Sequence, residues 1–213
     1  MNRYVTELIG TFFLVFVIGM VVTAGEPLAP LAIGAALMVM VYMGGHVSGA
    51  HYNPAVTIAL YLRGATPKGD VGPYIAAQIF GAWLGATAVQ LIAGETFPLS
   101  PGVEGLPGPL LAEILGTFAL CLVIMNVATS KRTEGNSYYG LAIGFTVMAF
   151  AYAVGGVSGG AFNPAVGTGP ILVDILTNNG SASDLWLYWV GPILGGLGAV
   201  PVFRLQEGGT EEA

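Results

Sequence analysis

The sequence predicts an all-α membrane protein with six membrane-spanning helices and two re-entrant half-helices, arranged as an inverted repeat. Three observations lead to this prediction. Of the 213 residues, 54% are hydrophobic and only 8% are charged, whereas a soluble domain has about 25% charged residues. Six apolar stretches are long enough to cross a bilayer. The triplet Asn-Pro-Ala occurs twice, once in each half of the chain.

Each predicted span is an apolar stretch of about twenty residues, the length at which a helix crosses a hydrocarbon core of roughly 30 Å. The chain also contains 33 glycines, and small residues allow membrane helices to pack closely. The predicted spans are residues 4–24, 28–47, 71–93, 109–129, 138–156 and 185–203.

The two Asn-Pro-Ala triplets have the residue pattern of helix starts. Asn53 and Asn163 are of a type that caps helix N-termini, and Pro54 and Pro164 occupy the first helical position, where a missing N–H costs nothing. The apolar runs 54–62 and 164–172 are each about nine residues long, or roughly 13 Å of helix. Because this is about half of a span, we predict two half-helices, one after the second span and one after the fifth.

The two halves of the chain repeat one another. The hexapeptides ELIGTF at 7–12 and EILGTF at 113–118 lie 106 residues apart, close to the 110 residues between Asn53 and Asn163. We therefore predict a single domain over residues 1–213, with repeats at about 1–96 and 107–206. Because each repeat has three spans, the two repeats must enter the membrane from opposite sides, and the repeat is inverted.

The distribution of charge predicts the orientation, because cytoplasmic loops collect Lys and Arg. All six basic residues fall on one side of the predicted spans: Arg3, Arg63, Lys68, Lys131, Arg132 and Arg204. The charged residues on the opposite side are all acidic: Glu26, Glu95, Glu104, Asp174 and Asp184. We expect an integral protein of the plasma (inner) membrane with both termini in the cytoplasm, and a mobile acidic tail after Arg204.

Half-helices that enter from opposite sides bring their N-termini together near the midplane, so two positive dipole ends face each other there. Irregular backbone is tolerated at that depth only where it is buried or lines a water-filled path. The stretches before Asn53 and Asn163 are therefore expected to line a pore for small neutral molecules, with their carbonyls as acceptors. The pore-lining loop residues expected here are Gly49, Ala50, His51, Gly159, Ala161 and Phe162.

The doubled motif and the repeat resemble those of the aquaporin, or major intrinsic protein, family along essentially the whole chain. The resemblance implies a homotetramer in membrane lipid with one pore per subunit, and it assigns Asn53 and Asn163 as the central hydrogen-bond donors. Glu7 and Glu113 occupy the positions of glutamates that brace the re-entrant loops, a role we favour over proton relay. His46 and His51 are expected to brace the first loop or to donate hydrogen bonds beside the pore.

The resemblance also places the selectivity filter, and here the chain departs from the family. Val166 stands three residues after the second Asn, where the family usually has arginine. The other three filter positions fall on Ile33, Ala151 and Gly160. A filter without arginine implies a wide apolar path for water and larger neutral solutes. The candidates are glycerol, urea, ammonia and undissociated arsenic acids, although glycerol facilitators look less similar after the second motif.

Other functional classes are less compatible with the sequence. A secondary transporter also uses inverted repeats and half-helices, and a structural membrane protein that keeps the fold is a further alternative. An enzyme is not expected, because no nucleophile and base lie in plausible reach and no cofactor motif is present. No cofactor is expected. One cysteine, Cys121, and two histidines do not suggest a metal site, and no basic patch suggests nucleic acid.

Overall fold

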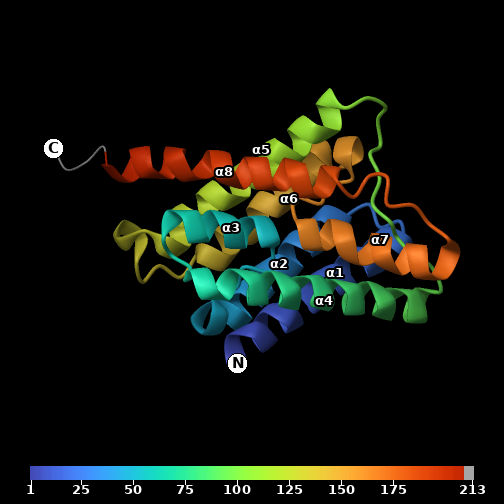
Figure 1. Ribbon diagram of the computed structural model, residues 1–213, viewed down its shortest axis with the longest axis horizontal. Coiled ribbons are helices and arrows are strands. Elements are labelled where there is room, and N and C mark those ends of the chain that lie inside the picture. The colour runs from blue at the N-terminus through green and yellow to red at the C-terminus, as the bar shows by residue number, and fades with distance from the viewer. Residues whose placement is uncertain (209–213) are drawn as a thin grey trace.

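The computed structural model describes residues 1–208, and these form helices joined by short connections (Figure 1). Six helices are long and apolar enough to cross a membrane, counting the π-helical extension of α5 to Thr129 as part of that helix. The helices are α1 Asn2–Thr23, α2 Ala29–Ser48, α3 Pro54–Arg63, α4 Lys68–Ala93, α5 Pro107–Ile124, α6 Tyr139–Ser158, α7 Pro164–Asn178 and α8 Leu187–Gly208. The six spans and two half-helices predicted from the sequence are therefore confirmed.

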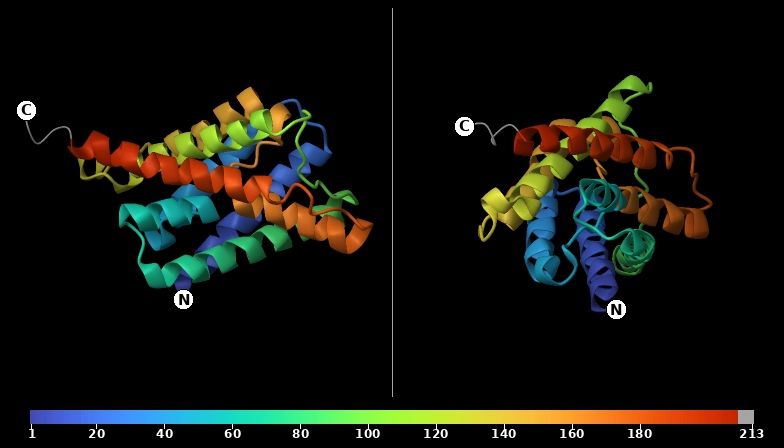
Figure 2. Two further views of the ribbon diagram at one scale, coloured as in Figure 1. Left: turned by 45° about the horizontal axis from the view of Figure 1, so that its top comes forward. Right: turned by 60° about the vertical axis from the view of Figure 1, so that its left-hand side comes forward.

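The helices pack with the symmetry of an inverted repeat. Helix α1 lies along α4, α5 lies along α8 in the equivalent manner, and α2 meets α6 between the two halves. The half-helices α3 and α7 enter from opposite ends of the molecule, and their N-termini point toward each other (Figures 1 and 2). Each half-helix contacts a span of the other half, α3 against α8 and α7 against α4. The two half-helices thus join the repeats around their meeting point.

Basic side chains gather at one end of the bundle, which we call the basic end. Arg3 pairs with Asp70 at 2.6 Å. Arg63 Nη2 donates to the carbonyl of Thr129 at 3.0 Å, and Arg204 Nη2 donates to the carbonyl of Leu62 at 2.7 Å. These bonds join the ends of α1, α3, α4, α5 and α8, so the basic loops predicted to share one side of the membrane do share one end of the molecule.

Two helices continue further than the sequence predicts. Helix α7 reaches Asn178 rather than residue 172, because Pro170 removes only one backbone donor and Asn179 then closes the helix in a left-handed conformation. Helix α8 includes residues 205–208, where a mobile tail was expected. The side chain of Glu207 accepts a bond from Ser130 Oγ at 2.5 Å, which holds this end in place. The remainder of that predicted tail, 209–213, lies outside the described residues.

Glycines set the distance between the paired spans. A Cβ on Gly81 of α4 would collide with the carbonyl oxygen of Leu8 in α1, and a Cβ on Gly195 of α8 would collide with that of Ile114 in α5. The backbones of both pairs therefore touch, as small residues permit in membrane helices. These contacts fix α1 and α5, which carry the two buried glutamates of the site.

Replacing Gly195 with Val is expected to lower the unfolding temperature in detergent. The new side chain meets backbone atoms of α5, including Phe118 N at 2.8 Å from the Cβ, and backbone cannot rotate away. Overpacking of this kind costs about 1–3 kcal/mol. Gly198→Val on the same helix is the control, because its nearest contact, the Phe118 ring, is an ordinary 3.5 Å away. Equal unfolding temperatures for the two variants would contradict the close α5–α8 contact.

Candidate functional site

The two loops that precede the half-helices have strained backbones. Ala50, Tyr52 and Phe162 have φ values of 51°, 49° and 48°, in the left-handed region that non-glycine residues seldom adopt. Gly49 and Gly159 also have positive φ, at 85° and 92°. Such strain persists only where surrounding contacts hold it. The loops must therefore be supported from outside.

Glu7 and Glu113 supply this support in the same manner. Glu7 is fully buried in α1, and its carboxylate accepts the backbone N–H groups of His51 at 3.0 Å and Tyr52 at 2.7 Å. Glu113, fully buried in α5, accepts those of Ala161 at 3.0 Å and Phe162 at 2.7 Å. Each carboxylate also accepts a serine hydroxyl at 2.7 Å, from Ser48 and Ser158 respectively. Each carboxylate therefore joins its own loop to the span that carries it.

The first loop has an additional polar network that the second lacks. Gln78 in α4 donates to Glu7 Oε2 at 2.8 Å and to Thr57 Oγ1 at 2.9 Å, and His51 Nδ1 lies 3.1 Å from the same hydroxyl. This series of hydrogen bonds runs from Glu7 through Gln78 and Thr57 to His51, which lines the cavity described below. In the second half, Ala161 and Gly167 stand at the positions of His51 and Thr57. The two loops are therefore equivalent in backbone but not in polarity.

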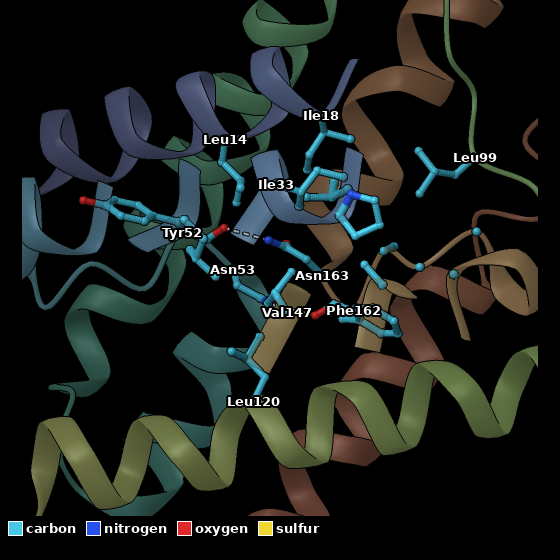
Figure 3. Close-up of a pocket in the computed structure, with 18 of the residues that line it drawn as sticks. Leu14, Ile18, Ile33, Tyr52, Asn53, Leu99, Leu120, Val147, Phe162 and Asn163 are labelled. Atoms are coloured by element: carbon cyan, nitrogen blue, oxygen red, sulfur yellow. Dashed lines mark hydrogen bonds between the residues drawn. The ribbon is translucent and has the colours of Figure 1, made fainter. Parts of the chain in front are cut away.

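Hydrogen bonds hold the side chains of the two asparagines where the half-helices meet. Asn53 Oδ1 accepts the N–H of Ala55 at 2.9 Å, and Asn163 Oδ1 accepts that of Ala165 at 2.9 Å, so both cap their half-helices as predicted. Across the molecule, Asn53 Nδ2 donates to the carbonyl of Phe162 and Asn163 Nδ2 to that of Tyr52, each at 2.9 Å (Figure 3). Each amide nitrogen carries two hydrogens, so one N–H per asparagine remains for a solute.

A cavity of about 340 Å³ opens beside the two asparagines. Asn53 and Asn163 line it together with all four predicted filter positions, Ile33, Ala151, Gly160 and Val166. It extends to the connection between the halves (Figure 3). A second cavity, of about 550 Å³, lies at the basic end, and both cavities are bounded by Ala50, Ile124 and Ile143. Two vestibules thus meet near the asparagine pair.

The remaining residues of the predicted site divide between the two cavities. His51, Gly159, Ala161 and Phe162 line the first, Gly49 lines the second, and Ala50 lines both.

His46 does not brace a loop. Its side chain is exposed at the mouth of the second cavity, and within residues 1–208 no hydrogen bond joins it to either loop. It lies in the last turn of α2, before the loop begins, so its closeness in sequence to Gly49 does not bring its side chain to the loop.

Sequence reasoning missed much of the cavity wall, including one whole segment outside the helices. Phe97, Pro98, Leu99 and Ser100, in the connection between the halves, line the first cavity. They carry no motif, and the surrounding prolines and glycines indicate only a loop. Among the described residues, no group of three or more His, Cys, Asp or Glu side chains is placed to hold a metal ion.

Two capped half-helices that meet between six spans, with a cavity on either side of their junction, define a membrane channel. The comparisons with known proteins agree, since residues 1–203 match the family described as Major intrinsic protein. The chain belongs to the major intrinsic protein family, which comprises channels rather than enzymes.

Relatives and one solved structure support this assignment. Aquaporin NIP1-1 of Zea mays is 36% identical over 96% of this chain and 74% of its own length. Aquaporin Z of Rhodopseudomonas palustris is 34% identical over 96% of this chain and 92% of its own. The X-ray structure of the aquaglyceroporin from Plasmodium falciparum has the same fold, with a TM-score of 0.82 and 24% identity, over 97% of this chain and 95% of that one.

Proposed function

We propose that this protein is a passive channel for water and small neutral solutes, with a wide apolar filter that lacks arginine. One observation carries the proposal: the cavity beside the asparagines is bounded at the four filter positions by Ile33, Ala151, Gly160 and Val166, none of which bears a charge. Pore width and lining donors set the selectivity of such channels. A wall of this kind admits solutes larger than water.

The centre of the path favours neutral molecules that accept hydrogen bonds. The second N–H of each asparagine is available to a solute oxygen or nitrogen, because the first is donated across the molecule. The N-terminal dipoles of α3 and α7 disfavour cations. Glycerol, urea, ammonia and undissociated arsenic acids meet these requirements, in addition to water.

Purified protein in liposomes tests the proposal by stopped-flow light scattering. We expect water, urea, glycerol and arsenous acid to cross faster than in protein-free liposomes of the same lipid. Water flux without any flux of the larger solutes would contradict the wide filter, and no added flux of any solute would support the structural alternative.

The buried ionisable groups favour a channel over a secondary transporter. Coupled transport needs a carboxylate or base that is free to bind an ion or proton. Glu7 accepts four hydrogen bonds and Glu113 accepts three, all from groups that hold the loops. Both carboxylates therefore serve the loops, which disfavours either of them as a coupling site.

The remaining features of the proposal concern assembly and orientation. We infer a single channel domain over residues 1–213 with repeats at about 1–96 and 107–206, a homotetramer in membrane lipid, and a plasma (inner) membrane location. The gathering of basic residues at one end supports a cytoplasmic position for that end and for both termini.

An impermeant amine reagent applied to sealed right-side-out vesicles is expected to spare Lys68 and Lys131, the only two lysines of the chain. The same reagent applied after the vesicles are opened should modify both. Labelling of either lysine in sealed vesicles would contradict the cytoplasmic position inferred for the basic end.

A further inference from the structure

A third cavity opens at the basic end, next to the second one. Its volume is about 490 Å³, and it lies where the N-terminal ends of α1 and α4 meet the loop before α3. The second and third cavities share four wall residues, Gly49, Ile124, Ala128 and Thr129. Arg63 holds this partition in place, because its Nε donates to Thr129 Oγ1 at 2.9 Å. The basic end therefore contains two hollows that lie on either side of one wall.

The third cavity reaches the centre of the path. His51 and Ile124 line it, and both also line the first cavity, which contains the asparagines. The His51 ring packs against Tyr74, another residue of the third cavity, with 5.0 Å between the ring centroids. The second cavity meets the first in a comparable way, at Ala50, Ile124 and Ile143. The first cavity thus adjoins both hollows of the basic end, one of them beside Ala50 and the other beside His51.

The charges in the wall of the third cavity balance each other. Of the described residues that line it, only Arg3 and Asp70 are charged. Arg3 Nη1 lies 2.6 Å from Asp70 Oδ2, and the other carboxylate oxygen accepts the hydroxyl of Tyr4 at 2.8 Å. Because both oxygens of the carboxylate have partners, the wall presents no unpaired anion to a cation. The cavity therefore suits neutral molecules.

Two buried side chains in this wall keep a polar atom without a partner in the part of the chain that the structure describes. Thr66 is only 7% exposed, and its hydroxyl makes no hydrogen bond. His51, also 7% exposed, has Nδ1 at 3.1 Å from Thr57 Oγ1, whereas Nε2 lies beside Gly49, where an added Cβ would be 3.2 Å away. Buried polar groups normally have a hydrogen-bond partner in the protein or in water. The hydroxyl and the ring nitrogen are therefore available to a molecule in the cavity.

We propose that the third cavity is a second entrance at the basic end, through which small neutral solutes that form hydrogen bonds reach the asparagine pair past His51. This inference rests on the proposed channel function and adds a route parallel to the second cavity. Thr66 exchanges a hydrogen bond with the solute inside the entrance, and His51 does so where the entrance joins the first cavity. Urea, which both donates and accepts hydrogen bonds, fits this lining.

Cysteine substitution allows each entrance to be obstructed separately. Gly45 lines the second cavity and not the third, and a Cβ there would have the Tyr139 ring as its nearest contact, at an ordinary 3.5 Å. Thr66 lines the third cavity and not the second, and cysteine is close to threonine in volume. The native Cys121 is buried. A bulky, impermeant methanethiosulfonate is supplied on both sides of the proteoliposome membrane, so the result does not depend on the orientation of the protein.

Urea permeability by stopped-flow light scattering is the readout. Labelled Gly45→Cys and labelled Thr66→Cys are each expected to lower it by about twofold or less, and the labelled double variant by about tenfold or more, because parallel entrances can replace each other. A reductant should restore the flux. Labelled Tyr138→Cys is the control, because Tyr138 lies at the same end, is 48% exposed and lines none of the three cavities. Mass spectrometry measures the extent of labelling.

A second comparison tests the chemistry of the entrance. When labelled Gly45→Cys obstructs the second cavity, the remaining urea passes Thr66. In that protein, Thr66→Val is expected to lower urea permeability by about threefold, the effect of one lost hydrogen bond, whereas Thr66→Ser keeps the hydroxyl and should leave it unchanged. Equal permeability of the valine and serine variants would contradict a hydrogen bond between Thr66 and the solute.

The outcomes separate this inference from the proposed function. If wild type conducts urea and the labelled double variant conducts no less than labelled Gly45→Cys, the third cavity is not an entrance and the channel function stands. If wild type conducts nothing above protein-free liposomes, the proposed function itself is overturned, and the second entrance is overturned with it.

Discussion

Replacing Glu113 with Ala is expected to abolish most of the correctly folded protein. The change removes the acceptor of three buried donors, the N–H groups of Ala161 and Phe162 and the hydroxyl of Ser158. An unsatisfied buried donor costs about 1–3 kcal/mol, so the loss totals roughly 3–9 kcal/mol, against a net stability of only about 5–15 kcal/mol. The left-handed Phe162 would also lose the contact that holds it. Size-exclusion chromatography and thermal unfolding in detergent measure the loss.

The control for this prediction is Glu95→Ala. Glu95 is an exposed acid in the connection between the halves, so its removal changes the net charge by the same amount without unsatisfying a buried donor. A Glu113→Ala protein as stable as Glu95→Ala, but with altered solute selectivity, would show that Glu113 serves the pore rather than the loop.

Replacing Val166 with Arg is expected to close the filter to solutes larger than water. Val166 is buried in the first turn of α7 and lines the cavity with Ile33 and Ala151. A guanidinium there adds bulk, a fixed positive charge and five N–H donors to a filter whose four side-chain positions, Ile33, Ala151, Gly160 and Val166, carry no charge and no donor. We expect urea and glycerol permeability to fall by about tenfold or more and water permeability to fall much less. Stopped-flow light scattering on liposomes measures both.

A matched arginine outside the pore controls for the added charge. Val103 lies in the connection between the halves, is 44% exposed and does not line the cavity, so Val103→Arg should leave all permeabilities unchanged. If water, urea and glycerol fluxes all fall in equal proportion in Val166→Arg, the assignment of Val166 to the filter is wrong.

The features that sequence predicts correctly here depend on short-range signals or on repetition. An Asn followed by Pro specifies a helix start whatever lies around it, and both Asn53 and Asn163 do cap their helices. The recurrence of a glutamate before Ile/Leu-Gly-Thr places Glu7 and Glu113 at equivalent positions, and the structure brings each to its own loop. The repeat thus identifies pairs of equivalent residues that could not be recognised from one half of the sequence alone.

The features that sequence could not predict depend on contacts between distant segments. Gln78, in α4, hydrogen-bonds to both Glu7 and Thr57. The repeat aligns Gln78 with Pro192, which has no side-chain amide, so the repeat gives no indication of the role of Gln78. Leu99 reaches the cavity only because glycines distant in sequence let the connection approach α6. His46 shows the reverse error, since closeness in sequence to a loop does not place a side chain within it.

In the proposed channel, the two vestibules and the asparagine pair form one continuous passive path. The most direct measurement is the initial rate of urea entry into proteoliposomes of the wild-type protein as a function of urea concentration. A passive path predicts a rate that rises in proportion to concentration from the millimolar to the molar range, independent of any ion gradient. A rate that saturates and depends on a proton or sodium gradient would contradict the channel and favour a transporter.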